Sequence, residues 1–160
     1  TTSLFFKSYR VQGELSDPLH HFLWSKKRIF STAPEIAKHI AQNTSEEQTI
    51  TGASTMTPLI ALLSHRRLAG NNVDTNAKVF KTGMRTEASF WNEVCDDNLQ
   101  YIVASARSFF TARRIRNHPM IGRYFFSERR FHDQRLLHWR SYPIELISLK
   151  TEFTKCSPSR

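Results

Sequence analysis

Residues 101–140 read YIVASARSFFTARRIRNHPMIGRYFFSERRFHDQRLLHWR and carry most of the excess positive charge of this 160-residue chain. The stretch contains nine arginines and no lysine, and its only acidic residues are Glu128 and Asp133. Eight aromatic residues are spread through it. The whole chain has a formal net charge of +9 and a pI near 10.0, so it attracts polyanions at long range.

The segments around this stretch predict helix before it and strand within and after it. From about residue 86 to residue 117, apolar side chains recur at steps of three and four, which predicts one long helix or two shorter ones. Pro119 ends that pattern. Residues 123–131 and 142–150 read as extended, and YPIELISLK at 142–150 is the clearest strand in the chain.

The first half of the chain alternates between both kinds of element. We expect a strand at 4–11, a short helix that starts at Asp17-Pro18, a helix at 32–43 capped by Thr32, a helix at 57–70 with Leu59, Leu62 and Leu63 as its apolar stripe, and a short strand at 77–82. The polar residues 44–57 are predicted to form a loop.

This irregular alternation, without a glycine-rich strand-to-helix turn, predicts an α+β fold. We expect a small mixed or antiparallel sheet packed with three to five helices. Residues 1–152 would form a single compact globular domain and 153–160 a flexible tail. The sequence holds no apolar run long enough to cross a bilayer and shows no signal-peptide pattern at its start, so we expect a soluble protein and favour an intracellular site of action.

Two cysteines are too few to define a disulfide framework or a metal site. We expect Cys95 and Cys156 to be reduced, and we expect Cys95, on the apolar stripe of a helix, to be structural and not a nucleophile. No metal site is predicted.

The interleaving of arginines and aromatic rings in 101–140 suits nucleic-acid binding, because guanidinium groups match phosphates and rings stack on unpaired bases. No RNA-binding signature or zinc-finger spacing accompanies it. The phenylalanines are expected to be core residues, which leaves arginines that either cover the surface or bind an anionic partner. The predicted contacts to RNA or DNA come from Arg107, Arg113, Arg114, Arg116, Arg123, Arg129, Arg130, Arg135 and Arg140, with Tyr124 and Trp139 as stacking surfaces.

A second constellation comprises Arg10, Ser31-Thr32 and Glu145. Their order resembles the arginine, Ser-Thr-Ser and glutamate elements of bacterial ADP-ribosyltransferase toxins. The resemblance implies that the arginine holds the phosphates of NAD, that Ser31 and Thr32 support the site, and that the glutamate stabilises the ribosyl cation. Ala33 stands at the third position of the Ser-Thr-Ser element.

Two other functions stay open from the sequence. A ribonuclease could use one of the histidines His118, His132 and His138 as general base, with arginines to stabilise the phosphorane. An interaction module for an acidic protein would use the same basic surface without chemistry. NAD is expected as a cofactor only in the transferase alternative, and otherwise no cofactor is predicted.

Overall fold

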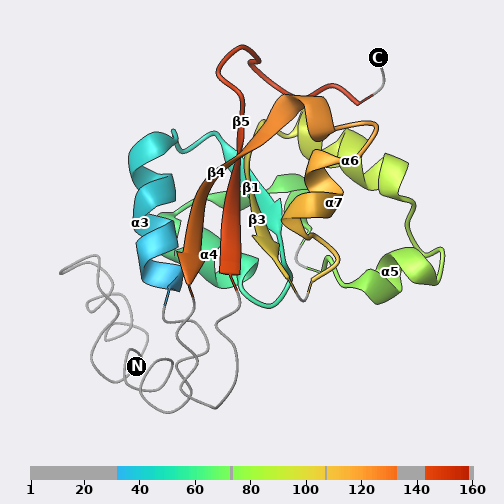
Figure 1. Cartoon of the computed structure of the whole chain (residues 1–160), viewed down its shortest axis with the longest axis horizontal. Helices are drawn as coiled ribbons and strands as arrows, with labels where there is room; N and C mark the ends of the chain where they lie inside the picture. The colour runs from blue at the N-terminus through green and yellow to red at the C-terminus, as the bar shows by residue number, and fades with distance from the viewer. Residues whose placement is uncertain (1–31, 73, 107, 133–142, 159–160) are drawn as a thin grey trace.

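The computed structural model describes residues 32–72, 74–106, 108–132 and 143–158. In this part of the chain a five-stranded mixed sheet lies between two groups of helices (Figure 1). The α+β class and the mixed sheet predicted from the sequence are thereby confirmed. The predicted strand at 4–11 and the predicted helix from Asp17 lie outside the described residues.

The sheet combines three parallel strands with an antiparallel pair. Its strands are β1 (Thr49–Gly52), β2 (Arg67–Leu68), β3 (Leu99–Ser105), β4 (Phe125–His132) and β5 (Pro143–Leu149). They lie in the order β2-β1-β3-β5-β4, in which β1 is parallel to β2 and β3, and β5 is antiparallel to β3 and β4. The helices are α3 (Ala33–Asn43), α4 (Thr57–Ser64), α5 (Ala77–Lys81), α6 (Glu87–Asp96) and α7 (Ala112–Arg116), with short 3₁₀ turns η2 (Ala69–Asn71) and η3 (Gly122–Tyr124).

The sheet has an apolar cluster on each face. Helices α3 and α4 pack on one face, while α6 and α7 pack on the other. Because successive side chains of a strand point to opposite faces, Tyr101 and Val103 belong to the α3–α4 cluster and Ile102 and Ala104 to the α6–α7 cluster. Strand β3 is therefore buried on both sides.

This two-sided burial explains the main error of the sequence interpretation. Residues 99–105 were predicted as part of a helix, and the structure shows strand β3 there. A strand that is covered on both faces is apolar at nearly every position and loses the period-two pattern. The predicted loop at 44–57 likewise contains strand β1, and the predicted strand at 77–82 is helix α5.

Helix α4 is shorter than predicted and turns a different side inward. It ends at Ser64, and His65 adopts a left-handed conformation with φ of 55°. Its buried residues include Ile60 and Ala61, whereas Leu62, assigned to the apolar stripe, is 58% exposed. Helix α3, the antiparallel pair β4 and β5, and helix α6 lie where the sequence predicts them.

The chain leaves the neighbouring parallel strands β1 and β3 toward opposite faces of the sheet. Strand β1 leads into α4 on one face, and β3 leads into α7 on the other. Crevices at the carboxyl ends of such strands are the usual ligand sites of open α/β sheets. Gly52 allows the close approach of β1 here, because its φ is 143° and an added Cβ would lie 2.2 Å from the Val103 carbonyl oxygen.

Cys95 and Cys156 form a disulfide, so the prediction of two reduced cysteines is wrong. Both residues are fully buried, and the bond attaches the segment after β5 to the end of α6. Phe153 packs against the ring of Tyr124 at a centroid distance of 4.8 Å and adds to the attachment.

Within the described ranges, no helix is long and apolar enough to cross a membrane.

Candidate nucleic-acid interface

Helix α7 carries three of the predicted arginines on a single short turn. Thr111 begins the helix, and its side-chain oxygen accepts a hydrogen bond from the Arg114 backbone N–H at 3.2 Å. Ile115 is buried and anchors the helix to the core. The side chains of Arg113, Arg114 and Arg116 are consequently left at the surface.

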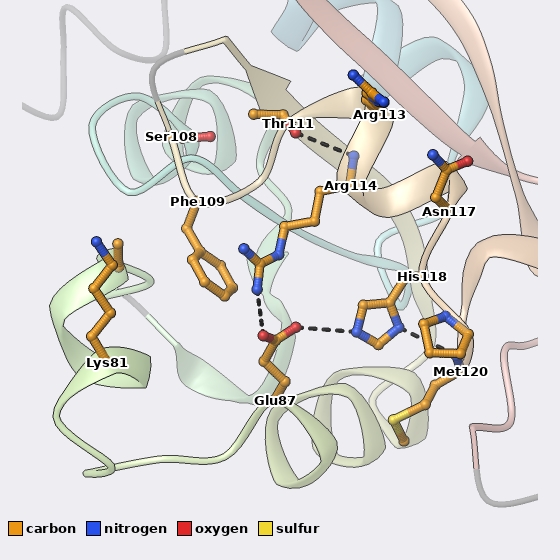
Figure 2. Close-up of a pocket in the computed structure, with 12 residues that line it drawn as sticks. Lys81, Glu87, Ser108, Phe109, Thr111, Arg113, Arg114, Asn117, His118 and Met120 are labelled. Carbon is orange, nitrogen blue, oxygen red and sulfur yellow. Dashed lines mark hydrogen bonds and ion pairs between the residues drawn. The ribbon is translucent and has the colours of Figure 1, made fainter.

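An open pocket of about 950 Å³ lies between α5 and α7 (Figure 2). Its lining combines apolar side chains with cationic and polar ones. The lining residues are Ala77, Lys81, Glu87, Ser108, Phe109, Thr111, Arg113, Arg114, Asn117, His118, Pro119 and Met120. A pocket of this composition suits a ligand with both an apolar and an anionic part.

The side chain of Arg114 is held by a chain of polar contacts. Its guanidinium group donates to Glu87 at the start of α6, and the other oxygen of Glu87 lies 3.1 Å from Nε2 of His118. Nδ1 of His118 accepts from the Met120 backbone N–H at 3.2 Å, which places the ring proton on Nε2. Glu87 thus fixes the arginine and is itself fixed by the histidine, as Figure 2 shows.

The guanidinium of Arg114 also continues a stack of aromatic rings. Phe80 and Phe109 stack with their planes 9° apart and their centroids 4.3 Å apart. The guanidinium carbon of Arg114 lies 3.9 Å from the centre of the Phe109 ring. This cation–π contact and the ion pair to Glu87 orient the planar group together.

Arg113 and Lys81 are the unpaired cations of the pocket. Both are exposed, and within the described ranges neither side chain makes an ion pair or a hydrogen bond. Lys81 comes from α5 and Arg113 from α7, so the pocket has a cationic group on each side of its opening (Figure 2). Arg113 also lines a second pocket on the other side of α7.

This second pocket, of about 330 Å³, lies at the carboxyl end of β3 and contains Glu145 of β5. Glu145 accepts hydrogen bonds from Ser127 Oγ at 2.7 Å, from Arg130 at 2.9 Å and from Arg116 at 3.1 Å. Burial acts to raise the pKa of Glu145, but the Ser127 hydroxyl and the two guanidinium groups outweigh it and hold this pKa below its usual range. The carboxylate is therefore ionised at neutral pH, and its two oxygens accept three hydrogen bonds.

The structure does not place all the predicted arginines on one surface. Arg130 pairs with Glu145 on the α7 face of the sheet, whereas Arg129 lies on the α3 face and pairs with Glu35 at 2.9 Å. The guanidinium of Arg123 lies over the ring of Tyr124 at 4.6 Å. Arg107, Arg135, Trp139 and Arg140 lie outside the described residues.

Tyr124 is not a stacking surface in this structure, which corrects that prediction. The residue is buried, and its hydroxyl donates to the Ser157 carbonyl at 2.9 Å. Phe126, assigned to the core from the sequence, is instead 41% exposed on β4. Phe109 and Phe110 do pack in the apolar cluster beneath α7, as expected.

The α3 face has a polar cluster of its own. His39 Nε2 lies 2.5 Å from a carboxylate oxygen of Glu128. Burial, together with the neighbouring Glu128 carboxylate, raises the pKa of Tyr101 to about 12. His39 and Glu128 are paired with each other, and the arginine nearby, Arg129, is paired with Glu35.

The residues of the transferase alternative do not come together among those described. Thr32 is buried next to α3, which packs on the face of the sheet opposite to Glu145, and its hydroxyl makes no capping hydrogen bond. Arg10 and Ser31 lie outside the described residues. For the ribonuclease alternative, both ring nitrogens of His118 are already engaged. His132 ends β4 and His138 lies outside the described residues.

The sequence interpretation did not single out Lys81 and Glu87, which line the larger pocket, or Phe80, which stacks on the lining residue Phe109. Only Glu87 had a local signal, since an acidic residue directly after the helix-capping Thr86 is favoured at a helix N-terminus. Within the described ranges, no group of three or more His, Cys, Asp or Glu side chains could hold a metal ion.

Comparison with known proteins adds no assignment. No protein family, curated protein or solved structure shows significant similarity to this chain.

Proposed function

We propose that this domain binds nucleic acid, RNA or DNA, across the surface of α7. The observation that carries the proposal is the position of Arg113, an exposed and unpaired cation that borders the pockets on both sides of the helix. Arg114 and Lys81 extend this positive region into the larger pocket. A phosphate chain that crosses α7 would meet all three side chains in succession.

Phosphate contacts of this kind make affinity depend steeply on salt, because bound cations are released from the nucleic acid. We therefore expect the log of the affinity to fall linearly with the log of salt concentration. The measurement is fluorescence anisotropy with a labelled random-sequence RNA and a DNA of the same length, across a salt series. A flat salt response, or no binding at low salt, would contradict the proposal.

A charge-matched pair of variants locates the surface. Arg113→Glu changes the charge beside both pockets, and Lys38→Glu makes the same sign change at an exposed position of α3 on the opposite face. We expect Arg113→Glu to weaken binding by about tenfold and to lower the salt slope by about 0.7 to 0.9 for the lost phosphate contact. Equal effects of both variants would show that only overall charge matters.

An enzymatic role at Glu145 is the second candidate, because this carboxylate lines a pocket at the carboxyl end of a parallel strand. Under the ADP-ribosyltransferase alternative the protein would consume NAD, and Glu145→Gln would abolish the reaction. The three partners that already engage Glu145 favour a structural role for it instead.

Saturable binding of an acidic protein at high salt would support the interaction-module alternative.

A further inference from the structure

The larger pocket contains a feature that phosphate binding alone does not require. The rings of Phe80 and Phe109 stack with their centroids 4.3 Å apart, and the guanidinium carbon of Arg114 lies 3.9 Å from the centre of the Phe109 ring. The stacked faces of Phe80 and Phe109 cover each other, and the guanidinium group of Arg114 lies against the Phe109 ring. Arg114 lines the pocket, so its guanidinium group is within reach of a ligand there.

A chain of polar contacts orients the guanidinium group of Arg114 in the absence of a ligand. Glu87 accepts from the guanidinium, His118 holds Glu87 at 3.1 Å, and the Met120 backbone N–H holds His118 at 3.2 Å. Preorganisation reduces the entropy that is lost when a flexible side chain becomes ordered in a complex.

The rest of the pocket suits a nucleotide unit. Phe109, Pro119 and Met120 provide apolar surface, and the amide of Asn117 provides donors and an acceptor for a base edge. Lys81 and Arg113 stand at opposite sides of the opening, where a phosphate on either side of the base would pass (Figure 2). Base stacking on arginine planes is a regular mode of single-strand recognition.

We propose that this pocket accepts one unpaired base of a nucleic-acid strand, stacked on Arg114, with its flanking phosphates on Arg113 and Lys81. The inference rests on the proposed function and specifies it: the substrate is single-stranded. In a duplex both faces of each base are covered by neighbouring pairs, so a duplex reaches the rim cations but not the guanidinium plane. A free mononucleotide has the same chemistry but lacks the second phosphate.

Arg114→Lys tests the stacking surface separately from the charge, because lysine keeps the positive charge and removes the planar group. Arg129→Lys is the matched control, since Arg129 lies on the opposite face and is paired with Glu35. Thermal melting of each variant checks that the fold is retained. The probes are a labelled oligothymidylate, the same strand annealed to its complement, and an abasic strand of equal length, with thymidine monophosphate as competitor.

We expect the intact single strand to bind more tightly than the abasic strand. Arg114→Lys should weaken binding of the intact strand by about tenfold, which corresponds to the stacking of one base, and leave binding of the abasic strand and the duplex within about twofold. Arg129→Lys should change none of them. The mononucleotide should compete only weakly.

Each contrary result has a distinct meaning. Equal affinity for intact and abasic strands, or an equal loss for all three probes in Arg114→Lys, would overturn the base-stacking site and leave nucleic-acid binding intact. A mononucleotide that binds as tightly as the strand would replace the strand by a free nucleotide as the ligand. Absence of binding to every probe at low salt would overturn the proposed function together with this inference.

Discussion

Two carboxylates on either side of α7 organise arginines in different ways. Glu145 accepts from Arg116, Arg130 and Ser127, and its side chain is only 12% exposed. Glu87, with its side chain 32% exposed, holds Arg114 by one ion pair and takes its second contact from His118. Glu145 thus pairs with two arginines, Arg116 and Arg130, whereas Glu87 pairs with one, Arg114.

This difference shows that the number of arginines in a segment does not tell which of them a ligand could reach. Arg116 and Arg130 lie in the most basic stretch of the chain, yet both pair with Glu145. These two contacts link α7 and β4, respectively, to β5. Arg114 is also paired, but with Glu87 alone among the described carboxylates, and it lines the larger pocket. We therefore expect the Glu145 cluster to govern stability and the Glu87 cluster to govern binding.

The largest effect should follow from Glu145→Gln. Removal of this charge leaves two arginines without their carboxylate, so we expect the free energy of unfolding to fall by about 1 to 3 kcal/mol. Affinity for single-stranded nucleic acid should not fall, because the lost negative charge by itself favours a polyanion. Urea unfolding and anisotropy on the same sample measure both quantities, and a large loss of affinity with unchanged stability would reverse the assignment of the two clusters.

The same cluster predicts a pH dependence of stability. Because the fold lowers the pKa of Glu145 from its ordinary value of 4.5, the unfolded chain binds this proton more tightly than the folded one. The contribution of Glu145 is therefore complete above the ordinary pKa and is lost as the pH falls through the folded-state value. The stability difference between wild type and Glu145→Gln should shrink over that acidic range, and a constant difference would exclude the carboxylate as its source.

Compared with Glu145→Gln, Glu87→Gln should change stability less and lower the affinity for single strands more. Its ion pair with Arg114 is partly exposed, so its loss should change stability by less than about 1 kcal/mol. Removal of a negative charge would by itself strengthen binding to a polyanion. We nevertheless expect single-strand affinity to fall by about two- to tenfold, because Arg114 loses its fixed orientation. An increase in affinity would show that only local charge matters.

Ser127→Ala should produce the smallest change. The hydroxyl donates to Glu145 at 2.7 Å but carries no charge, so we expect a loss of stability of about 1 kcal/mol or less. Binding should be unaffected. Equal destabilisation by Ser127→Ala and Glu145→Gln would indicate that the two arginines contribute nothing to the cluster.

Two elements were predictable from local patterns. Helix α3 has one buried face and follows from the spacing of its apolar positions, and β5, although buried on both faces, follows from its run of β-branched and apolar residues. Strand β3 could not be recognised in this way, because its apolar positions also fit the helical repeat that continues from α6. The sheet order depends on contacts between distant segments, which no local pattern records.

The candidate site was predictable only in part for the same reason. The composition of 101–140 singled out the arginines of α7, but the partners that decide their roles come from elsewhere. Glu87 lies 27 residues before Arg114, and Glu145 lies 29 residues after Arg116. Likewise, two cysteines 61 residues apart give no sign of pairing until the fold brings their Cα atoms to 5.1 Å. Such bonds are typical of proteins that fold in oxidising compartments.

The disulfide also determines whether the fragments separate after a protease cuts the chain once. Its two cysteines enclose β3, α7, β4 and β5 in one covalent ring, so every arginine of both carboxylate clusters lies inside that ring. A single cut of the backbone anywhere between Cys95 and Cys156 would leave the two fragments linked, and they would separate on a gel only after reduction. A cut before Cys95 would release the preceding fragment without reduction. The segment from Cys95 to Cys156 would therefore stay attached to the rest of the chain after a single cut within it.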